Sequence, residues 1–416
     1  MTSQQLQDAI AFNEIRDVQQ TNCCIVGAGP AGAVLALLLA RQGIPVTLLE
    51  AHQNFDREFR GDTIHASVME IMDELGLADR LLQIPHTKIP SVIYVTANGS
   101  VTASDYSRLK TKYPYIMVLS QARFLEFITT EAKRYPNFQL VMGGNVQELI
   151  EEDGVIRGVR YRGQGGTHEV RSHLTVAADG RFSRIRKLAS LEPRQIAPPM
   201  DILWFRLPRL PEDSELTHLN IAVRFGRGYY MAMTDRFEYW QIAYVIPKGS
   251  YPQLRTAGLE AFRQSIVELL PEFCDRVDSL KDWSQVPLLS VGMSRVPQWY
   301  RPGLLLIGDS AHVMSTVAGV GINCAIQDAV VAANVLSKQL KAGNLRTRDL
   351  AAVQLQRELP TRIMQALQSA AQRQVAAKAL NPNRAFTPPL SLRIPFLRHL
   401  ATRLVAFGVW PVHVKN

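Results

Sequence analysis

Three short segments, far apart in the sequence, combine glycine with an acidic residue or with a second glycine. The first is GAGPAG at residues 27–32, the second is Asp179-Gly180 in VAADGRFSRIR, and the third is Gly308-Asp309 in LLLIGDSAH. Glycine lets the backbone turn sharply and approach a ligand closely, and a carboxylate accepts hydrogen bonds from sugar hydroxyls. Together these residue types indicate nucleotide binding.

The GAGPAG segment has the flanking elements that dinucleotide binding requires. It follows the apolar segment CCIV, precedes AVLALLLARQG, and is followed by a second apolar segment that ends at Glu50. This order predicts a strand, a helix and a parallel strand, with the pyrophosphate at the positive end of the helix. Glu50 would accept hydrogen bonds from ribose. The predicted contacts are Gly27, Ala28, Gly29, Pro30, Ala31, Gly32, Glu50 and Ala51.

A second, distant nucleotide contact favours FAD over NAD, because FAD extends through a ribityl chain to a flavin ring. Gly308-Asp309 ends an apolar strand, and the loop 316–323 after it contains Gly319 and Gly321. A helix that starts at 321–323 would place N–H groups and a positive dipole end beside the charge of reduced flavin. The alternatives are a helix N-cap for Asp309 and a turn for Asp179. We expect His312 to be structural.

Composition narrows the class of protein. The chain has 416 residues, of which 47% are hydrophobic, so it can bury a large core in two or three domains. The polar N-terminus does not resemble a signal peptide, and we expect no spanning helix and no metal site. The four cysteines lack CxxC spacing, which favours buried thiols in a reducing cytosol.

The net charge of +9 is concentrated at one end of the chain. Residues 341–416 contain twelve Lys/Arg and two acidic residues, a difference of +10, so the rest of the chain is close to neutral. This local excess does not indicate nucleic-acid binding. The tail includes IPFLRHLATRLVAFGVW, in which Phe396, Leu397, Leu400, Leu404 and Phe407 share one helical face. We expect this face to dock on the protein core; weak contact with a membrane surface is the alternative.

Periodicity predicts the remaining elements. Helices are expected over 67–83, 120–135 and 256–274, and a β-meander with a turn at GQGG is expected over 145–178. Alternating aromatic segments between 200 and 246 predict antiparallel strands of one broad sheet. The chain after residue 341 is expected to be mostly helical.

In this order, the three motifs resemble those of the flavoprotein monooxygenases of the aromatic-hydroxylase type, similar to para-hydroxybenzoate hydroxylase. The resemblance covers about residues 21–340 and implies an α/β fold with a Rossmann-like FAD-binding domain of the glutathione-reductase type. It assigns 21–90, 115–190 and 285–340 to that domain. Residues 91–114 and 191–284 would form an interleaved antiparallel-sheet substrate domain, and 341–416 a helical, basic C-terminal region.

The resemblance also implies roles for single residues. Asp309 would accept a hydrogen bond from a ribityl hydroxyl, and Asp179-Gly180 would lie near the pyrophosphate, where nicotinamide approaches. Further FAD contacts are implied at Arg60, Gln121, Arg123, Val146, Gly308, Gly319, Val320, Gly321, Ile322 and Asn323. Two residues depart from the family pattern: Thr316 stands where proline is common, and Val320 stands where relatives are often polar.

The implied reaction uses NAD(P)H and O₂ to hydroxylate an aromatic or polyketide-like molecule through a flavin C4a-hydroperoxide. Because no second GxGxxG occurs in the right context, NAD(P)H would bind only transiently. The flavin carries the chemistry, so no catalytic side chain is predicted. Substrate-pocket candidates are Arg206, Tyr230, Gln241 and Tyr244, followed by Trp204, Arg224, Met233 and Trp240.

Two rival functions stay open. One is an FAD-dependent reductase or dehydrogenase acting on a lipophilic, prenyl-type substrate. The other is a non-enzymatic protein similar to Rab escort proteins that kept the fold and lost the flavin. Arg181, Arg184 and Arg186 would suit a 2′-phosphate, although a solvated basic face is the preferred interpretation. We expect a cytoplasmic protein; its oligomeric state is not predicted.

Overall fold

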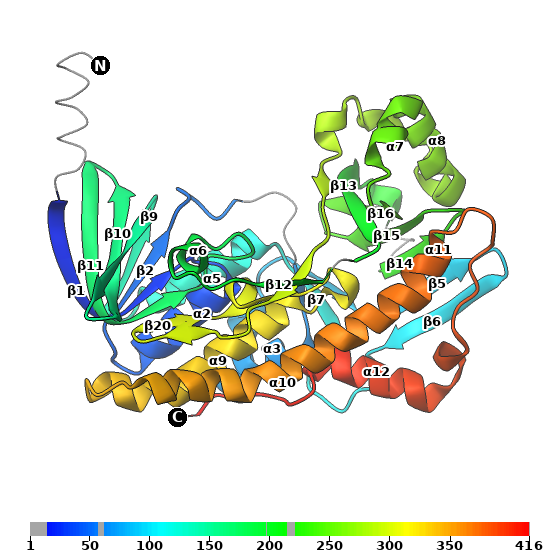
Figure 1. Cartoon of the computed structure of the whole chain (residues 1–416). Coiled ribbons are helices and arrows are strands. Elements are labelled where there is room, and N and C mark those ends of the chain that lie inside the picture. Colours follow the sequence, from blue (N-terminus) through cyan, green and yellow to red (C-terminus); the bar gives the residue numbers. More distant parts are fainter. Residues whose placement is uncertain (1–14, 57–61, 197, 214–220, 416) are drawn as a thin grey trace, which may run out of the picture.

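The computed structural model describes residues 15–56, 62–196, 198–213 and 221–415. The predicted FAD contact Arg60 lies outside these ranges. Two large sheets dominate the molecule, one at each end, and long helices run beneath them (Figure 1). The α/β fold class predicted from the sequence is confirmed.

The first sheet has eight strands and contains the predicted βαβ unit. Its main path runs β19 (Tyr300–Arg301), β20 (Leu304–Leu306), β11 (Gly166–Ala177), β1 (Ile15–Val26), β2 (Val46–Glu50) and β8 (Phe138–Met142). The pairs from β20 to β8 are parallel, and the connection from β1 to β2 passes through a helix, as a parallel pair requires. β1 begins earlier than the predicted strand because its polar first half pairs with β11.

The predicted meander forms an extension of this sheet. β9 (Asn145–Glu152), β10 (Val155–Gly163) and β11 are antiparallel, and Gly163 faces Gly166 across the expected GQGG turn.

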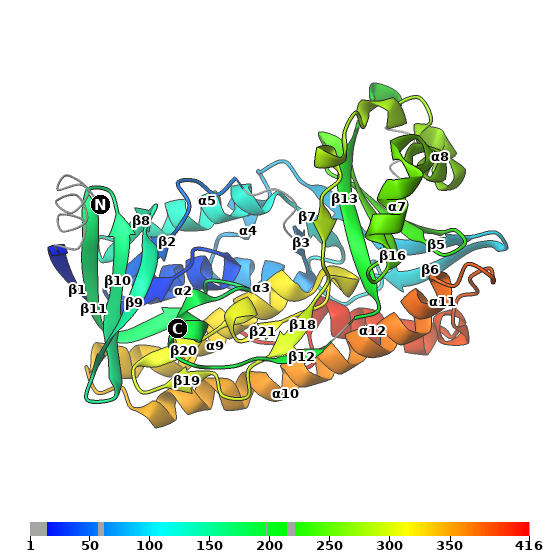
Figure 2. The same ribbon diagram turned by 45° about the horizontal axis from the view of Figure 1, so that its top comes forward.

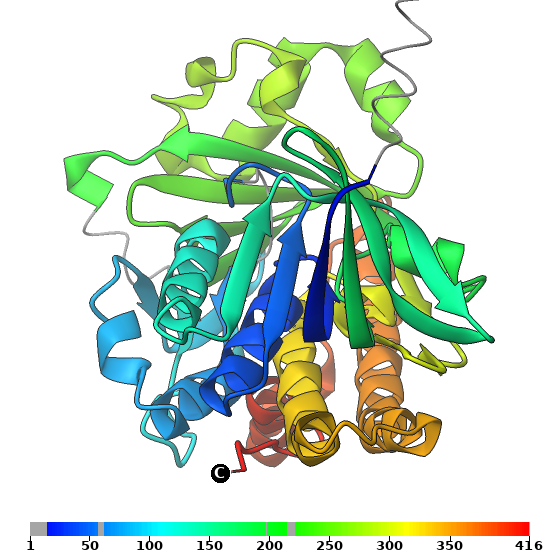
Figure 3. The same ribbon diagram turned by 90° about the vertical axis from the view of Figure 1, so that its left-hand side faces the viewer.

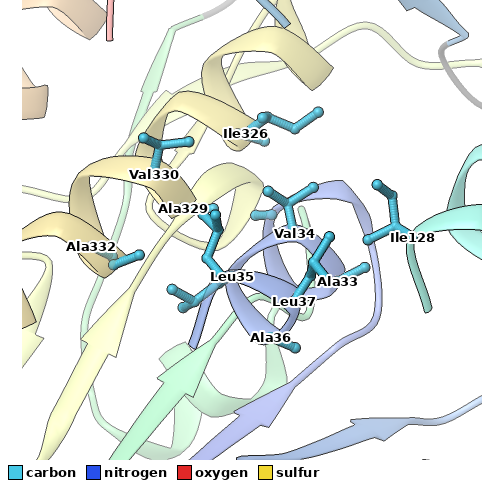
Figure 4. Close-up of a cluster of buried hydrophobic side chains, with 14 of the residues drawn as sticks. Ala33, Val34, Leu35, Ala36, Leu37, Ile128, Ile326, Ala329, Val330 and Ala332 are labelled. Carbon is cyan, nitrogen blue, oxygen red and sulfur yellow. The ribbon is translucent and has the colours of Figure 1, made fainter. Parts of the chain in front are cut away.

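Helix α2 (Pro30–Arg41) follows the glycine-rich turn and packs between α5 (Gln121–Ala132) and α9 (Gly321–Lys341). In Figure 4, Val34 and Leu35 of α2 lie close to Ile326 and Ala329 of α9. All four side chains are buried. α9 and the turn before it (317–341) are apolar and long enough to span a membrane, but 72% of the apolar window is buried in the protein. α9 is therefore the central core helix.

The second sheet has seven strands in the order β17 (Leu288–Leu289), β13 (Met200–Pro208), β16 (Tyr239–Pro247), β15 (Tyr230–Asp235), β14 (Ile221–Phe225), β5 (Ser91–Thr96) and β6 (Gly99–Asp105). It is antiparallel as predicted, except for the parallel pair β14–β5. α7 (Tyr251–Ala257) and α8 (Leu259–Leu269) lie beside this sheet (Figure 2). β17 belongs to this sheet although it falls within a range predicted for the FAD domain; the domain boundaries stay a prediction.

Smaller elements connect the two large sheets. Two three-stranded sheets contain β3 (Thr63–Ile64), β7 (Ile116–Val118) and β4 (Thr87–Ile89), and β12 (Arg194–Ile196), β18 (Met293–Arg295) and β21 (His312–Val313). The short helices are α3 (Ala66–Glu74), α4 (Ala78–Leu81) and α6 (Arg184–Leu188). α3 and α4 divide the region predicted as one helix over 67–83.

The C-terminal region is helical, as predicted. α10 (Thr347–Ala371) lies next to α9, on one side of the eight-stranded sheet (Figure 3), and extends toward the seven-stranded sheet (Figure 2). A π-helical turn (Gln372–Ala376), α11 (Ala377–Ala379) and α12 (Pro395–Phe407) follow. α12 docks through Thr402 and Ala406, whereas Phe396 is 73% exposed. The prediction that the apolar face of this helix docks on the core is therefore wrong for its first half.

Cys23, Cys24 and Cys324 are buried thiols, as predicted, while Cys274 is exposed. Burial raises the pKa of the Cys24 thiol to about 12. The buried cysteines therefore act as small apolar side chains.

Candidate FAD site

The GAGPAG turn joins β1 to α2 and leaves one side of its backbone open. A Cβ added at Gly32 would lie 2.0 Å from the carbonyl oxygen of Gly27, and one added at Gly27 would lie 2.4 Å from the carbonyl oxygen of Ala178. Packing within the protein therefore requires glycine at both positions, whether or not a ligand is bound. A Cβ at Gly29 would meet no protein atom within 4 Å. Space beside Gly29, in front of the first N–H groups of α2, suits a pyrophosphate.

The carboxylate of Glu50 lies directly beside this turn. Its side chain is buried, and Oε2 accepts a hydrogen bond of 3.0 Å from the backbone N–H of Ala28. Ala51 follows on the exposed end of the strand. Val146 is buried in the core cluster that contains Val26 of β1 and Leu49 of β2. The residues predicted for the adenosine end of the ligand are therefore neighbours.

The second motif contacts the third directly. Ser310, next to Asp309, donates from Oγ to Asp179 Oδ1 (3.0 Å) and accepts from the N–H of Gly180 (3.0 Å). Gly308 approaches the first motif, because a Cβ there would lie 3.1 Å from Cβ of Ala31. All three motifs therefore meet at the carboxyl ends of β1, β11 and β20, as the sequence predicted.

Sequence reasoning did not identify Ser183, Ser310 and Arg186 as parts of this junction. Ser183 donates to Asp179 Oδ1 and caps α6 by accepting from the N–H of Arg186. Arg186 is buried, which lowers its pKa, and it donates to the carbonyl oxygens of Ser310 and Arg181. The predicted basic cluster therefore breaks up: Arg186 is a buried structural residue and is neither solvated nor open to a phosphate. The sequence signal was a serine shortly after each Asp: Ser310 directly follows Asp309, and Ser183 lies four residues after Asp179.

The third motif is fixed by a buried ionic network that was also missed. Asp328 of α9 accepts from the N–H of Gly308 (3.0 Å) and from Nε2 of His312 (2.6 Å), and Arg357 of α10 donates from Nε at 2.7 Å. Burial alone would raise the pKa of Asp328, but the charges of His312 and Arg357 hold it at about 2. His312 is thus structural, as predicted, and α10 helps to position the turn before Asp309.

The loop before α9 is tightly shaped. Ala318 and Gly319 have φ values of 62° and 61°, and Thr63 Oγ1 donates to the carbonyl oxygen of Gly319 (2.9 Å). α9 begins at Gly321, as predicted, so the N–H groups of Gly321, Ile322 and Asn323 have no partner in the preceding turn of the helix. Val320 points into a core cluster with Met314 and Met364, which explains its apolar character.

The side chain of Asn323 holds the loop and does not point away from it. Its Oδ1 accepts from the N–H of His65 (2.8 Å), and Nδ2 donates to the carbonyl oxygens of Thr63 and Gly319. Nε2 of His65 donates to the carbonyl oxygen of Ala318. Burial lowers the pKa of His65 to about 4, so this histidine is neutral at physiological pH.

A cavity of about 200 Å³ brings predicted FAD contacts together with substrate-pocket candidates. Gln121 and Arg123, at the start of α5, line it together with Arg206 and Gln241 of the seven-stranded sheet. Arg123 forms an ion pair of 2.9 Å with Glu238, and the guanidinium of Arg206 lies 4.7 Å from the ring centre of Tyr239. The two groups of candidates therefore meet at one border.

The structure resolves which face each strand residue of the second sheet occupies. Tyr230 and Trp204 pack in the cluster that includes Val317 of the loop before α9. Arg206 of β13 and Gln241 of β16 are paired across these two strands. Each is two residues from a member of this cluster on its own strand, Trp204 and Ala243, so both share this side. Tyr244 lies on the other face, where it packs against Phe262 of α8 and donates to Ser265 Oγ (3.1 Å). The prediction that Tyr244 lines the pocket is therefore wrong. It is also wrong for Arg224, Met233 and Trp240, which lie on this other face.

Comparison with known proteins identifies the family. The FAD binding domain family matches residues 20–352. Over 408 residues, the chain is 33% identical to 6-methylpretetramide 4-monooxygenase of Streptomyces rimosus, covering 96% of this chain and 95% of the relative. The chain belongs to the FAD-dependent monooxygenases of the aromatic-hydroxylase type.

More distant proteins resemble this monooxygenase in sequence or fold. Para-nitrophenol 4-monooxygenase of Pseudomonas sp. strain WBC-3 is 25% identical, with coverage of 77% of this chain and 78% of the relative. Squalene epoxidase 4 of Arabidopsis thaliana is also 25% identical, covering 79% and 64%. The structure of p-nitrophenol 4-monooxygenase from Pseudomonas putida DLL-E4 matches with a TM-score of 0.74, 19% identity and coverage of 93% and 94%.

FAD is the cofactor of this monooxygenase, and NAD(P)H is the usual reductant in its family. The geometry of the three motifs fits that cofactor. Gly29 has an open side, and the carboxylate of Glu50 lies beside the same turn. The three motifs meet at the ends of β1, β11 and β20, and α9 starts after the third of them.

Proposed function

We propose that this monooxygenase uses NAD(P)H and O₂ to hydroxylate an aromatic or polyketide-like molecule at the border between its two sheets. The observation that carries the proposal is the meeting of the three motifs through Ser310, Asp179 and Gly308. The relative that matches nearly the whole chain is named for oxygen insertion into a compound of this class. Bound FAD supplies electron transfer from NAD(P)H and activation of O₂.

The residues of this chain bind, orient and enclose the reactants. Gly29 leaves room for the pyrophosphate, Glu50 recognises ribose, and Asp309 recognises the ribityl chain. The first N–H groups of α9 stabilise negative charge on the flavin pyrimidine ring. Asp179-Gly180 lies where nicotinamide approaches. Gln121 and Arg123, which line the cavity, would border the cofactor on that side.

Tyr230 does not act as a base at physiological pH. Burial raises the pKa of Tyr230 well above its usual value, and its hydroxyl contacts the sulfur of Met200 at 3.4 Å. A neutral phenol can donate a hydrogen bond but cannot abstract a proton from the substrate. Arg206, which is exposed at the cavity, is the remaining candidate for stabilising a phenolate.

The test uses the FAD-loaded protein with NADPH or NADH, isotopically labelled O₂ and a panel of phenols and polycyclic aromatic ketones. We expect substrate-stimulated oxidation of the nicotinamide and a product that gains one labelled oxygen atom. Reduction of a substrate without incorporation of oxygen would instead support the rival reductase. That rival is not favoured, because the lipid-related relatives are also named for oxygen insertion. The non-enzymatic alternative is set aside by membership of the monooxygenase family.

We also propose that the enzyme works in the cytosol and contacts anionic membranes weakly through α12. Leu397 and Leu400 are 41% and 42% exposed on the side of α12 that faces away from the core. Residues 359–416 contain eight Lys/Arg and no Asp or Glu, which suits anionic lipid. Sedimentation with vesicles that contain phosphatidylglycerol checks this. Equal recovery with neutral phosphatidylcholine vesicles would rule out a charge-dependent contact.

A further inference from the structure

The loop that leads to the flavin is held on one side by glutamines of the C-terminal region. Oε1 of Gln368 accepts from the N–H of Ser315 (3.1 Å), and its Nε2 donates to the carbonyl oxygens of Ser315 (3.0 Å) and Val317 (2.8 Å). Gln372 donates to the hydroxyl of Ser315. Both glutamines are buried. The amide of Gln368 satisfies backbone groups on each side of Thr316, and the two glutamines together hold this part of the loop in place.

The opposite side of the same loop is held by β3 and the start of α3. Thr63 donates to the carbonyl oxygen of Gly319, and His65 donates to that of Ala318. The loop from Ser315 to Gly319 is therefore fixed from two directions before any ligand binds. A group within it that still lacks a partner is presented at a defined position.

Two hydrogen-bond groups at this loop and the facing sheet do lack a partner among the described residues. They are the hydroxyl of Thr316 and the indole N–H of Trp204, and both atoms are buried. Val317, next to Thr316, and Trp204, on β13, pack against the same apolar cluster. A buried donor without an acceptor costs about 1–3 kcal/mol, so such groups in a fixed site indicate a ligand that completes them.

The surroundings define the chemistry of that ligand. The cluster contains Tyr94, Phe225, Tyr230 and Phe386, with ring centres of Phe225 and Phe386 only 3.9 Å apart. Arg206, on the same side of the sheet, lies at the polar cavity. Aromatic walls with two neutral donors suit a flat, uncharged ring system that carries oxygen acceptors.

We infer that Thr316 and Trp204 are specificity residues that donate hydrogen bonds to the oxygens of an uncharged polycyclic aromatic ketone or phenol. The inference rests on the proposed function, because it places this substrate class in the monooxygenase site. The aromatic cluster aligns the ring system, and the two donors select oxygenated rings over hydrocarbons. A ring that carries a charged group is disfavoured because the charge would lose its hydration among the apolar rings.

Equilibrium titration of the FAD-loaded protein with dihydroxyanthraquinone tests the inference, with the flavin absorbance as the readout. We expect Thr316→Val, which removes the hydroxyl at nearly constant volume, to weaken binding about five- to tenfold. Thr316→Ser, which keeps the hydroxyl, restores wild-type affinity. Trp204→Phe weakens binding by a similar factor. Anthraquinone sulfonate, a charged ring of similar size, binds more weakly than the neutral probe.

Tyr244→Phe is the matched control, because it removes a hydroxyl from the opposite face of the same sheet. Its affinity for the probe should equal that of the wild type. The FAD content and the ligand-free flavin spectrum of Thr316→Val should also be unchanged. Wild-type affinity in Thr316→Val would overturn the inference. So would an altered ligand-free spectrum with unchanged affinity, since the hydroxyl would then act on the flavin. Loss of FAD from the wild-type protein would instead contradict the proposed function.

Discussion

The two ends of the proposed FAD site are built in different ways. At the adenosine end, the turn at residues 27–32 is shaped by glycines adjacent in the sequence and by Glu50, which is 22 residues from Ala28. At the flavin end, the loop from Ser315 to Gly319 is shaped by Gln368, more than 50 residues away, and by Thr63, 256 residues from Gly319. A local motif thus shapes one end of the proposed site, and tertiary contacts shape the other.

Gly29→Ala would give the largest effect. No protein atom lies within 4 Å of the added Cβ, and the φ value of −70° suits alanine. We therefore expect the free energy of unfolding of the FAD-free protein to change by less than about 1 kcal/mol. The Cβ would instead occupy the space of the pyrophosphate, and FAD affinity should fall at least about tenfold in equilibrium dialysis.

Gly292→Ala is the control for this substitution, because its Cβ would also meet no protein atom within 4 Å. Its FAD affinity should match the wild type. If Gly29→Ala bound FAD as tightly as Gly292→Ala, the pyrophosphate would not lie at this turn.

Gln368→Leu should have a smaller effect on FAD and a larger effect on stability. It would leave the buried N–H and carbonyl groups of Ser315 without their side-chain partner, which costs about 1–3 kcal/mol in the free energy of unfolding. Gln368→Leu would also loosen the loop from Ser315 to Gly319. We expect FAD affinity to fall less than in Gly29→Ala, because the adenosine contacts remain. Urea unfolding and FAD titration measure the two quantities separately.

Gln354→Leu is the control, because it makes the same change on α10 at a place that does not contact the loop from Ser315 to Gly319. Gln354 contacts the backbone of Trp299 and Pro297. It should lose similar stability and keep wild-type affinity for FAD. Equal losses of FAD affinity in the two variants would show that α10 acts only through global stability, contrary to the role assigned to Gln368.

This contrast explains how much the sequence could predict. The βαβ unit, the meander and the meeting of the three motifs were predicted correctly, because glycine spacing and apolar strand ends specify them locally. The face occupied by Tyr244 was not, because alternation gives two apolar faces and only packing against α8 decides between them. The roles of Asp328 and Gln368 were not predicted either, since a polar residue on a helix shows its partner only in three dimensions.

The experimental structure of the protein with bound FAD tests the central claim most directly. The account predicts adenosine beside Glu50 and Val146, the pyrophosphate over Gly29, the ribityl chain at Asp309, and the flavin ring beside the loop from Thr316 to Asn323. FAD bound with its ring away from this loop, or with Asp309 out of contact with the ribityl chain, would contradict it.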